Sequence, residues 1–218
     1  MIAGRGPSAL AGVALACLTL AACGHGGATM REPTQFANDP SWRVVAHFPV
    51  VRQTSEVDCG AAALASLLDY WGQPTGIADI TKAHPPDSQR GIYARDLRDF
   101  ARRTSLSAYL LAGTLDDLER ELGVGRPVLV GLVRTESNRA YGHYAVVVGL
   151  KRDRTRVLLV DPAKGWLEQP VDAFVGTWGR ARWVTLVVMP REPEAFVRPD
   201  RNSNCRGGGG PQCAVSIR

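Results

Sequence analysis

The amino-acid sequence predicts an α+β domain in which helices come first and strands second. Between residues 59 and 122, apolar side chains recur at the three- and four-residue spacing of amphipathic helices. Later apolar residues form continuous runs rich in valine and leucine, at 127–133, 141–150, 157–160 and 182–189, as is typical of buried strands. Helices grouped before strands indicate a segregated α+β fold, whereas regular alternation would indicate parallel βαβ units.

Length and composition are those of one globular domain with tails. The chain of 218 residues is 45% hydrophobic and 22% charged, and its formal net charge is +5. Its arginines lie mainly in 90–103, 151–156 and 180–206, without the regular alternation with aromatic side chains that base stacking needs. We interpret these stretches as solvated faces and expect no nucleic-acid partner.

The first residues are interpreted as a targeting segment. Arg5 supplies a positive start, and the apolar stretch 9–22 is too short to span a membrane. The tetrapeptide Leu-Ala-Ala-Cys that ends at Cys23 resembles a bacterial lipobox, which implies that signal peptide 1–22 is removed and that Cys23 is lipidated. Gly24 in place of aspartate resembles lipoproteins sorted to an outer membrane. An ordinary secretory signal is the alternative, and either one places the mature domain outside the cytoplasm.

Segments without regular structure are expected on both sides of a domain at 44–190. Residues 23–43 are rich in Gly, Pro, Thr and Asn and lack periodicity, so we expect a flexible tether. The tail 191–218 is rich in Gly, Pro and Arg and is expected to be poorly ordered. Within it, Cys205 and Cys213 enclose a short loop. A disulfide between them suits an oxidising compartment, and two unpaired thiols are the alternative.

Local signals delimit the elements of the domain. Residues 44–51 form an apolar run that contains Pro49, which restricts it to an edge strand or an extended entry segment. The helix that begins at Cys59 ends near Gly72, before Pro74. The other predicted elements are helices at 77–83, 93–103, 115–122 and 171–178, a strand at 106–111, and a polar loop at 134–140 that leads into a hairpin of strands 141–150 and 157–161.

Cys59 is the candidate nucleophile. The alanines after it and the spacing of apolar residues from 64 to 71 predict a helix that starts at this residue. Because the free N–H groups and the dipole of a helix start favour a thiolate, we expect a partly ionised thiol at neutral pH. The side-chain amide of Gln53 and the Cys59 backbone N–H are expected to form an oxyanion hole. Asp58 would raise the thiol pKa if it faced the sulfur, so we assign it to capping the helix.

A cysteine nucleophile needs a base, and the base needs a group that orients it. His143 is the candidate base, near the start of its strand, and Asp161 ends the following strand. The polar stretch 151–156 joins the two strands as a hairpin, and this pairing would bring Asp161 close to His143. His84 precedes two prolines and is interpreted as a loop residue. No second Cys or His lies at ligand spacing from Cys59 or His143, so we expect no metal or other cofactor.

Taken together, these motifs resemble those of a known enzyme family. The chain resembles the papain-like cysteine peptidases that cleave double-glycine leaders from bacteriocin precursors, which are family 39 of the cysteine peptidases. The resemblance lies in four motifs in this order: Gln53, Asp58-Cys59-Gly60 before an Ala/Leu helix, Gly142-His143-Tyr144 on a strand, and Asp161-Pro162. The resemblance covers about residues 51–190. It implies a papain-like fold with N-terminal helices packed on a mainly antiparallel sheet, and a protein or peptide substrate cut after a Gly-Gly pair.

The sequence departs from the better-known members of that family. After the predicted signal it has neither an apolar span nor a glycine-rich phosphate loop, so we expect no transporter domain in this chain. The predicted function is that of a lipid-anchored peptidase on the periplasmic face of the outer membrane, acting on an exported protein. A catalytically silent peptide-binding lipoprotein and an acyltransferase with the same Cys/His site are the alternatives. The intact motif disfavours the first, and nothing in the sequence excludes the second.

Overall fold

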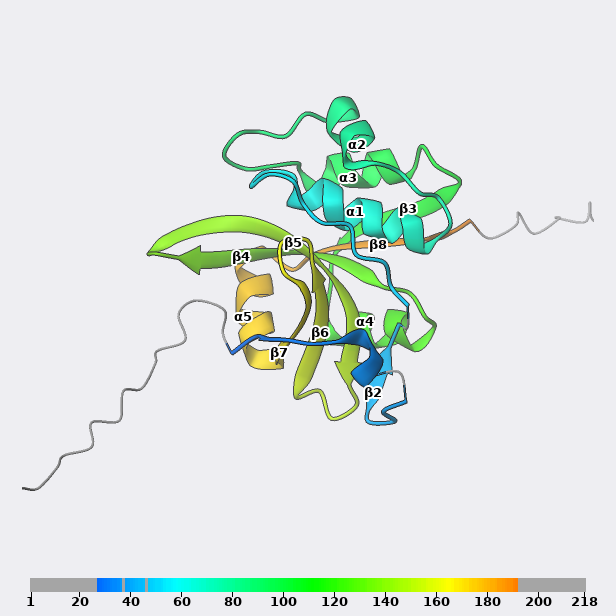
Figure 1. Cartoon of the computed structure of the whole chain (residues 1–218), viewed down its shortest axis with the longest axis vertical. Helices are drawn as coiled ribbons and strands as arrows, with labels where there is room; N and C mark the ends of the chain where they lie inside the picture. Colours follow the sequence, from blue (N-terminus) through cyan, green and yellow to red (C-terminus); the bar gives the residue numbers. More distant parts are fainter. Residues whose placement is uncertain (1–26, 37, 46, 192–218) are drawn as a thin grey trace, which may run out of the picture.

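The computed structural model describes residues 27–36, 38–45 and 47–191 (Figure 1). The predicted signal peptide, the predicted lipidation site Cys23 and the possible disulfide pair Cys205 and Cys213 lie outside these residues. The described strands form one antiparallel eight-stranded sheet in the order β1-β7-β6-β5-β4-β8-β3, with β2 paired to β5. The strands are β1 (Thr29–Met30), β2 (Trp42–Val44), β3 (Leu106–Ala112), β4 (Val128–Glu136), β5 (Arg139–Lys151), β6 (Arg156–Asp161), β7 (Gly165–Pro170) and β8 (Val184–Pro190).

Helices cover both faces of the sheet and confirm the α+β prediction (Figure 1). Alternate residues of β5 point to opposite faces, so Val146 and Val148 join a core with α1, α2 and α3, whereas Ala145 and Val147 join a second core with α4 and α5. Each predicted helix is present, with ends shifted by up to two residues. The helices are α1 (Cys59–Tyr70), α2 (Ile77–Ala83), α3 (Ala94–Ala101), α4 (Leu115–Gly123) and α5 (Val171–Arg180), with a short 3-10 helix η1 (Pro33–Gln35).

Helix α1 is the buried centre of the first core. Its residues from Cys59 to Leu68 are all buried, so it lacks the solvent face of an ordinary amphipathic helix. Small residues allow this close packing. A Cβ added at Gly60 would lie 3.0 Å from Cδ2 of Tyr144, which shows how near the start of the helix comes to β5. This contact places the first turn of α1 beside the strand that carries the predicted base.

The polar loop predicted at 134–140 is wrong. Strands β4 and β5 continue through it as a long hairpin that projects from the body of the sheet (Figure 1). They turn at Ser137 and Asn138, whose φ angles of 46° and 64° are those of a tight two-residue hairpin turn. Residues 135–140 are exposed, so this arm lacks the apolar alternation by which a half-buried strand is recognised.

The segment before the domain packs more closely than the tether prediction for 23–43 allows. β1 pairs with β7 and β2 pairs with β5, so this stretch adds strands to the sheet. Phe36 and Trp42 are buried, with ring centroids 5.0 Å apart. The packed part therefore begins at Thr29, because aromatic burial and ladder hydrogen bonds offset the entropy of ordering a Gly- and Pro-containing segment. For 44–51 the sequence left an edge strand or an extended entry segment open. β2 ends at Val44, and the described residues 45 and 47–51 belong to no strand, which fits the entry segment.

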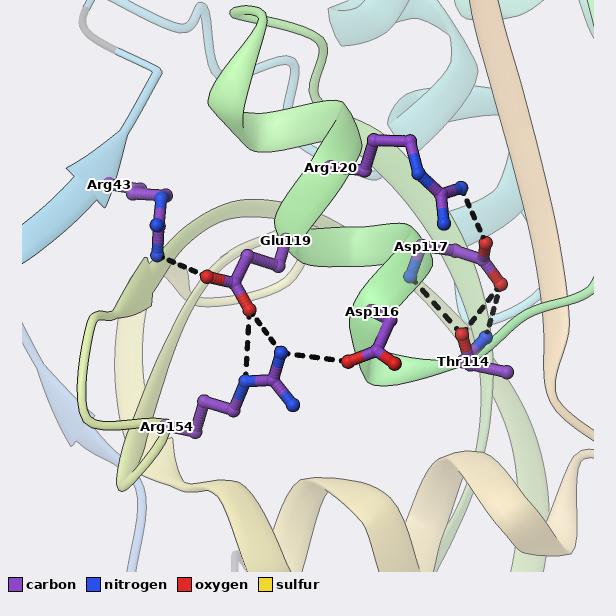
Figure 2. Close-up of polar contacts among 7 residues, drawn as sticks. All are labelled: Arg43, Thr114, Asp116, Asp117, Glu119, Arg120 and Arg154. Atoms are coloured by element: carbon purple, nitrogen blue, oxygen red, sulfur yellow. Dashed lines mark hydrogen bonds and ion pairs between the residues drawn. The ribbon is translucent and has the colours of Figure 1, made fainter.

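Ion pairs connect strand β2 of the N-terminal segment to α4 (Figure 2). The Glu119 carboxylate accepts from Arg43 on β2 and from Arg154 in the β5–β6 turn, with Arg154 Nε 2.9 Å from Oε2. Thr114 caps α4, because its side chain accepts from the Asp117 N–H. The network joins β2, the turn and α4 on the face of the sheet opposite α1.

Within the described residues, no helix is both long and apolar enough to span a membrane.

Candidate active site

Cys59 is the first residue of α1, as predicted, and its side chain is 5% exposed. Asp58 precedes it, but the prediction that Asp58 caps the helix is wrong. Its carboxylate instead accepts from the Thr54 hydroxyl at 2.6 Å and from the backbone N–H of Thr54 and Ser55. The residue has a non-helical conformation that turns the side chain back toward the preceding loop. Asp58 therefore orders the loop that carries Gln53.

The predicted pairing of His143 with Asp161 is confirmed. β5 and β6 form the expected antiparallel hairpin, and Val146 lies opposite Val160. His143 Nε2 is 3.0 Å from Asp161 Oδ2. The other carboxylate oxygen, Oδ1, accepts from the backbone N–H groups of Ala163 and Lys164 at 2.8 and 3.1 Å. Because Nε2 is engaged, Nδ1 is the imidazole nitrogen that remains for proton transfer.

Arg134 on β4 is a further charged residue of the site that the sequence prediction missed. Its Nη1 is 2.6 Å from Oδ2 of Asp161, the same oxygen that meets His143. Arg134 is 8% exposed and Asp161 is fully buried. Alternate residues of a strand share a face, so the buried Leu132, two positions earlier, is the signal that could have placed Arg134 inward. The incorrectly predicted loop at 134–140 concealed this signal.

The buried position of Cys59 and His143 opposes charge on both side chains. Burial raises the pKa of the Cys59 thiol, and backbone N–H groups of Tyr144 and Gly60 oppose the rise only in part. Burial also lowers the pKa of His143; the Asp161 hydrogen bond counteracts this, whereas the positive charge of Arg134 reinforces it. The predicted direction of the thiol pKa shift is therefore wrong. Loss of water around the sulfur outweighs the helix start, and the two shifts favour a neutral thiol and a neutral imidazole.

The surroundings of Asp161, in contrast, favour the charged form of its carboxyl group. Burial on its own would raise the pKa of this carboxyl, but hydrogen bonding and positive charge from His143 and Arg134 hold it well below its usual range. Asp161 is therefore ionised throughout the neutral range. It is the fixed negative charge against which an imidazolium would form.

The resting state of the thiol makes a testable prediction. In a chain whose other four cysteines are replaced by serine, the pH midpoint of Cys59 alkylation by iodoacetamide is expected to lie above the free-thiol value of about 8.5. Unfolding in urea should return it to that value, because the cause is burial. A midpoint below 8.5 in the folded chain would restore the expectation of a preformed thiolate.

Gln53 lies beside the Asp161 turn. Its backbone N–H donates to the carbonyl of Pro162 at 3.1 Å, and its side-chain Nε2 donates to the Ser55 carbonyl at 2.8 Å. Its Oε1 is buried without a hydrogen-bond partner among the described residues. The amide has two N–H groups, so one remains to meet a substrate oxyanion. The role of Gln53 as an oxyanion donor stays a prediction.

His84 lies apart from this group. It ends α2, and its Nε2 meets Nη2 of Arg103 at 2.8 Å in an exposed position, in keeping with the loop interpretation. The described residues contain no cluster of three or more His, Cys, Asp or Glu side chains that could hold a metal ion.

Comparison with known proteins places this chain and its fold among peptidases. A family model described as the peptidase C39 family matches residues 47–192. The processing and transport ATP-binding protein for lactococcin G of Lactococcus lactis subsp. lactis, LagD, is 25% identical over 150 residues, which make up 69% of this chain and 20% of LagD. The chain thus spans about a fifth of the length of that curated relative.

Two solved structures share the fold. The peptidase domain of Streptococcus ComA, a bifunctional ABC transporter of a quorum-sensing pathway, has a TM-score of 0.56 at 20% identity, covering 66% of this chain and all of that one. A double-glycine motif protease from an AMS/PCAT transporter, solved with its leader peptide, has a TM-score of 0.52 at 22% identity, covering 66% of this chain and 91% of that one.

Proposed function

Because this chain belongs to the peptidase C39 family and is a cysteine peptidase, we propose that Cys59, His143 and Asp161 form its catalytic triad. The observation that carries the proposal is the buried hydrogen bond of 3.0 Å between His143 Nε2 and Asp161 Oδ2. It lies next to the start of α1, where the Tyr144 backbone N–H meets the Cys59 sulfur. A nucleophile, a base and an oriented carboxylate are thereby supplied by one helix start and one hairpin.

The proposed reaction starts from the neutral pair. As Sγ of Cys59 attacks the peptide carbonyl, Nδ1 of His143 takes the thiol proton, and Asp161 stabilises the imidazolium that forms. The oxyanion accepts from the Cys59 backbone N–H and the free N–H of the Gln53 amide. His143 then protonates the departing amine, which leaves a thioester on Cys59. Water, activated by the same imidazole, hydrolyses the thioester and restores the thiol.

The proposed substrate is an exported polypeptide cut after a Gly-Gly pair. Support comes from the motif resemblance and from the relative that is a double-glycine motif protease bound to a leader peptide. The proposed location is the periplasmic face of the outer membrane, with a lipid on Cys23. It is supported by the lipobox-like tetrapeptide and by Gly24.

Substrate identification tests the proposal. Envelope proteins would be incubated with the full mature chain or with its Cys59→Ala variant, and new N-termini identified by mass spectrometry. N-termini that appear only with the wild type and follow a Gly-Gly pair support a peptidase of the proposed specificity. Carboxyl ends joined to an added amine in place of water would identify the acyltransferase. Peptide binding without any new end would identify the silent binder.

Gln53→Ala is expected to lower turnover by a factor on the order of 10²–10³, because one of two oxyanion donors is removed. Substrate affinity should change little, since the oxyanion exists only after attack. Steady-state kinetics on the identified peptide measure both quantities. Glu56→Ala, an exposed change in the same loop, is the matched control and should retain wild-type kinetics. A loss confined to affinity would make Gln53 a recognition residue instead.

A further inference from the structure

Two donors share one oxygen of Asp161. His143 Nε2 lies 3.0 Å and Arg134 Nη1 lies 2.6 Å from Oδ2, while two backbone N–H groups of the following turn occupy Oδ1. Arg134 and Asp161 come from different strands, β4 and β6, with β5 between them. The arginine therefore reaches across the strand of the base to meet its carboxylate.

We propose that Arg134 is a positioning residue of the active site, which fixes the Asp161 carboxylate for His143 and balances its charge. The inference rests on the proposed role of His143 as the base. Arg134 does not contact the reacting sulfur in this arrangement; it acts through Asp161.

The positioning argument follows from the freedom of a carboxylate. Rotation about the terminal bond of Asp is only weakly restricted, so the position of each carboxylate oxygen depends on its own partners. The backbone N–H groups of Ala163 and Lys164 hold Oδ1, and Arg134 holds Oδ2 independently of the imidazole. The arginine guanidinium is rigid and planar. It therefore fixes the direction of its hydrogen bond to Oδ2 more closely than the flexible ammonium group of a lysine would.

The charge argument follows from burial. Asp161 is fully buried, and a buried carboxylate without a charged partner is strongly destabilising. The charged groups that act on the His143 imidazole are Asp161 from β6, Arg134 from β4 and Lys164 from the β6–β7 turn, and the Tyr141 ring lies beside it with the centroids 6.4 Å apart. From α1, burial raises the pKa of the Cys59 thiol and so favours its neutral form. Burial is the main cause that lowers the pKa of His143, and the positive charge of Arg134 adds to it by offsetting part of the attraction of Asp161.

The test is the titration of His143 followed by NMR of the imidazole Cε1–H groups in the full mature chain. Arg134→Gln removes the positive charge, so the midpoint of His143 is expected to move upward by about one pH unit. Arg134→Lys keeps the charge and should leave the midpoint near that of the wild type. Arg139→Gln, an exposed arginine of the same hairpin, is the matched control and should leave it unchanged. A midpoint in folded Arg134→Gln equal to that of the wild type overturns the inference.

Steady-state kinetics distinguish the positioning of Asp161 by Arg134 from the effect of the Arg134 charge. If a substrate is cut, Arg134→Lys is expected to lose about tenfold in kcat with little change in KM, because charge is retained and the rigid fork is lost. Wild-type kcat in Arg134→Lys overturns the positioning part. If Arg134→Gln does not fold, the double variant Arg134→Gln/Asp161→Asn removes both charges and should fold; failure to fold overturns the pairing. The titration needs no substrate, so a chain that cuts nothing but shows the shift refutes the proposed function and not this inference.

Discussion

Cys59→Ala is expected to abolish peptide-bond cleavage, with a loss in turnover on the order of 10⁶-fold. Removing Sγ eliminates the covalent step, and His143 and Asp161 cannot substitute for it. The fold should be retained, because alanine is a strong helix former and the replaced side chain is small and buried. Peptide binding should also persist. Product formation by mass spectrometry and peptide binding by fluorescence anisotropy measure the two properties.

The Cys59→Ser variant tests whether catalysis needs the sulfur atom itself or only a polar group of similar size at this position. A serine hydroxyl retains size and polarity, but it is a far weaker nucleophile than a thiol unless its base is matched to it. Turnover should therefore fall nearly as far as in Cys59→Ala. Cleavage at the wild-type rate by either variant would show that another group performs the attack.

Asp161→Asn is expected to lower both activity and stability. The amide lacks the negative charge that stabilises an imidazolium, and its NH₂ group can favour the wrong tautomer, so turnover should fall on the order of 10⁴-fold. The guanidinium of Arg134, 8% exposed, also loses its counter-charge, and breaking a buried ion pair by removing one partner costs about 3–5 kcal/mol of the free energy of unfolding. Urea unfolding and steady-state kinetics measure the two losses. The double variant Arg134→Gln/Asp161→Asn should recover stability without recovering activity.

The same variant tests the pH dependence of folding. The folded pKa of Asp161 is held below its unfolded value, so its contribution to stability is present above the unfolded value of about 3.9 and is lost as the pH falls through the folded value. Wild-type stability should fall in that acid range, and the fall should be shallower in Asp161→Asn. Equal slopes for the two chains would contradict the ion-pair assignment.

The sequence was sufficient where the relevant contacts are local. The start of α1 at Cys59 follows from apolar spacing and alanine content over about three turns. The pairing of His143 with Asp161 follows from a hairpin of neighbouring strands, in which the joining turn brings together residues 18 positions apart. The five helices and the antiparallel hairpin were therefore predictable, and so was the resemblance to a peptidase family.

Only the tertiary structure decided the features that depend on distant segments. β1 pairs with β7, where Met30 lies opposite Leu167, and the side chain of Arg31 just after β1 forms an ion pair with Glu168, 137 positions away. No local pattern encodes such partners. Arg134 lies at the base of a hairpin arm whose outer residues meet water; the buried Leu132 indicates its face, but its partner Asp161 lies on β6, two strands away in the sheet. The direction of the Cys59 pKa shift was wrongly predicted for the same reason: the helix start is a local property, but the burial that raises the thiol pKa comes from the whole fold around it.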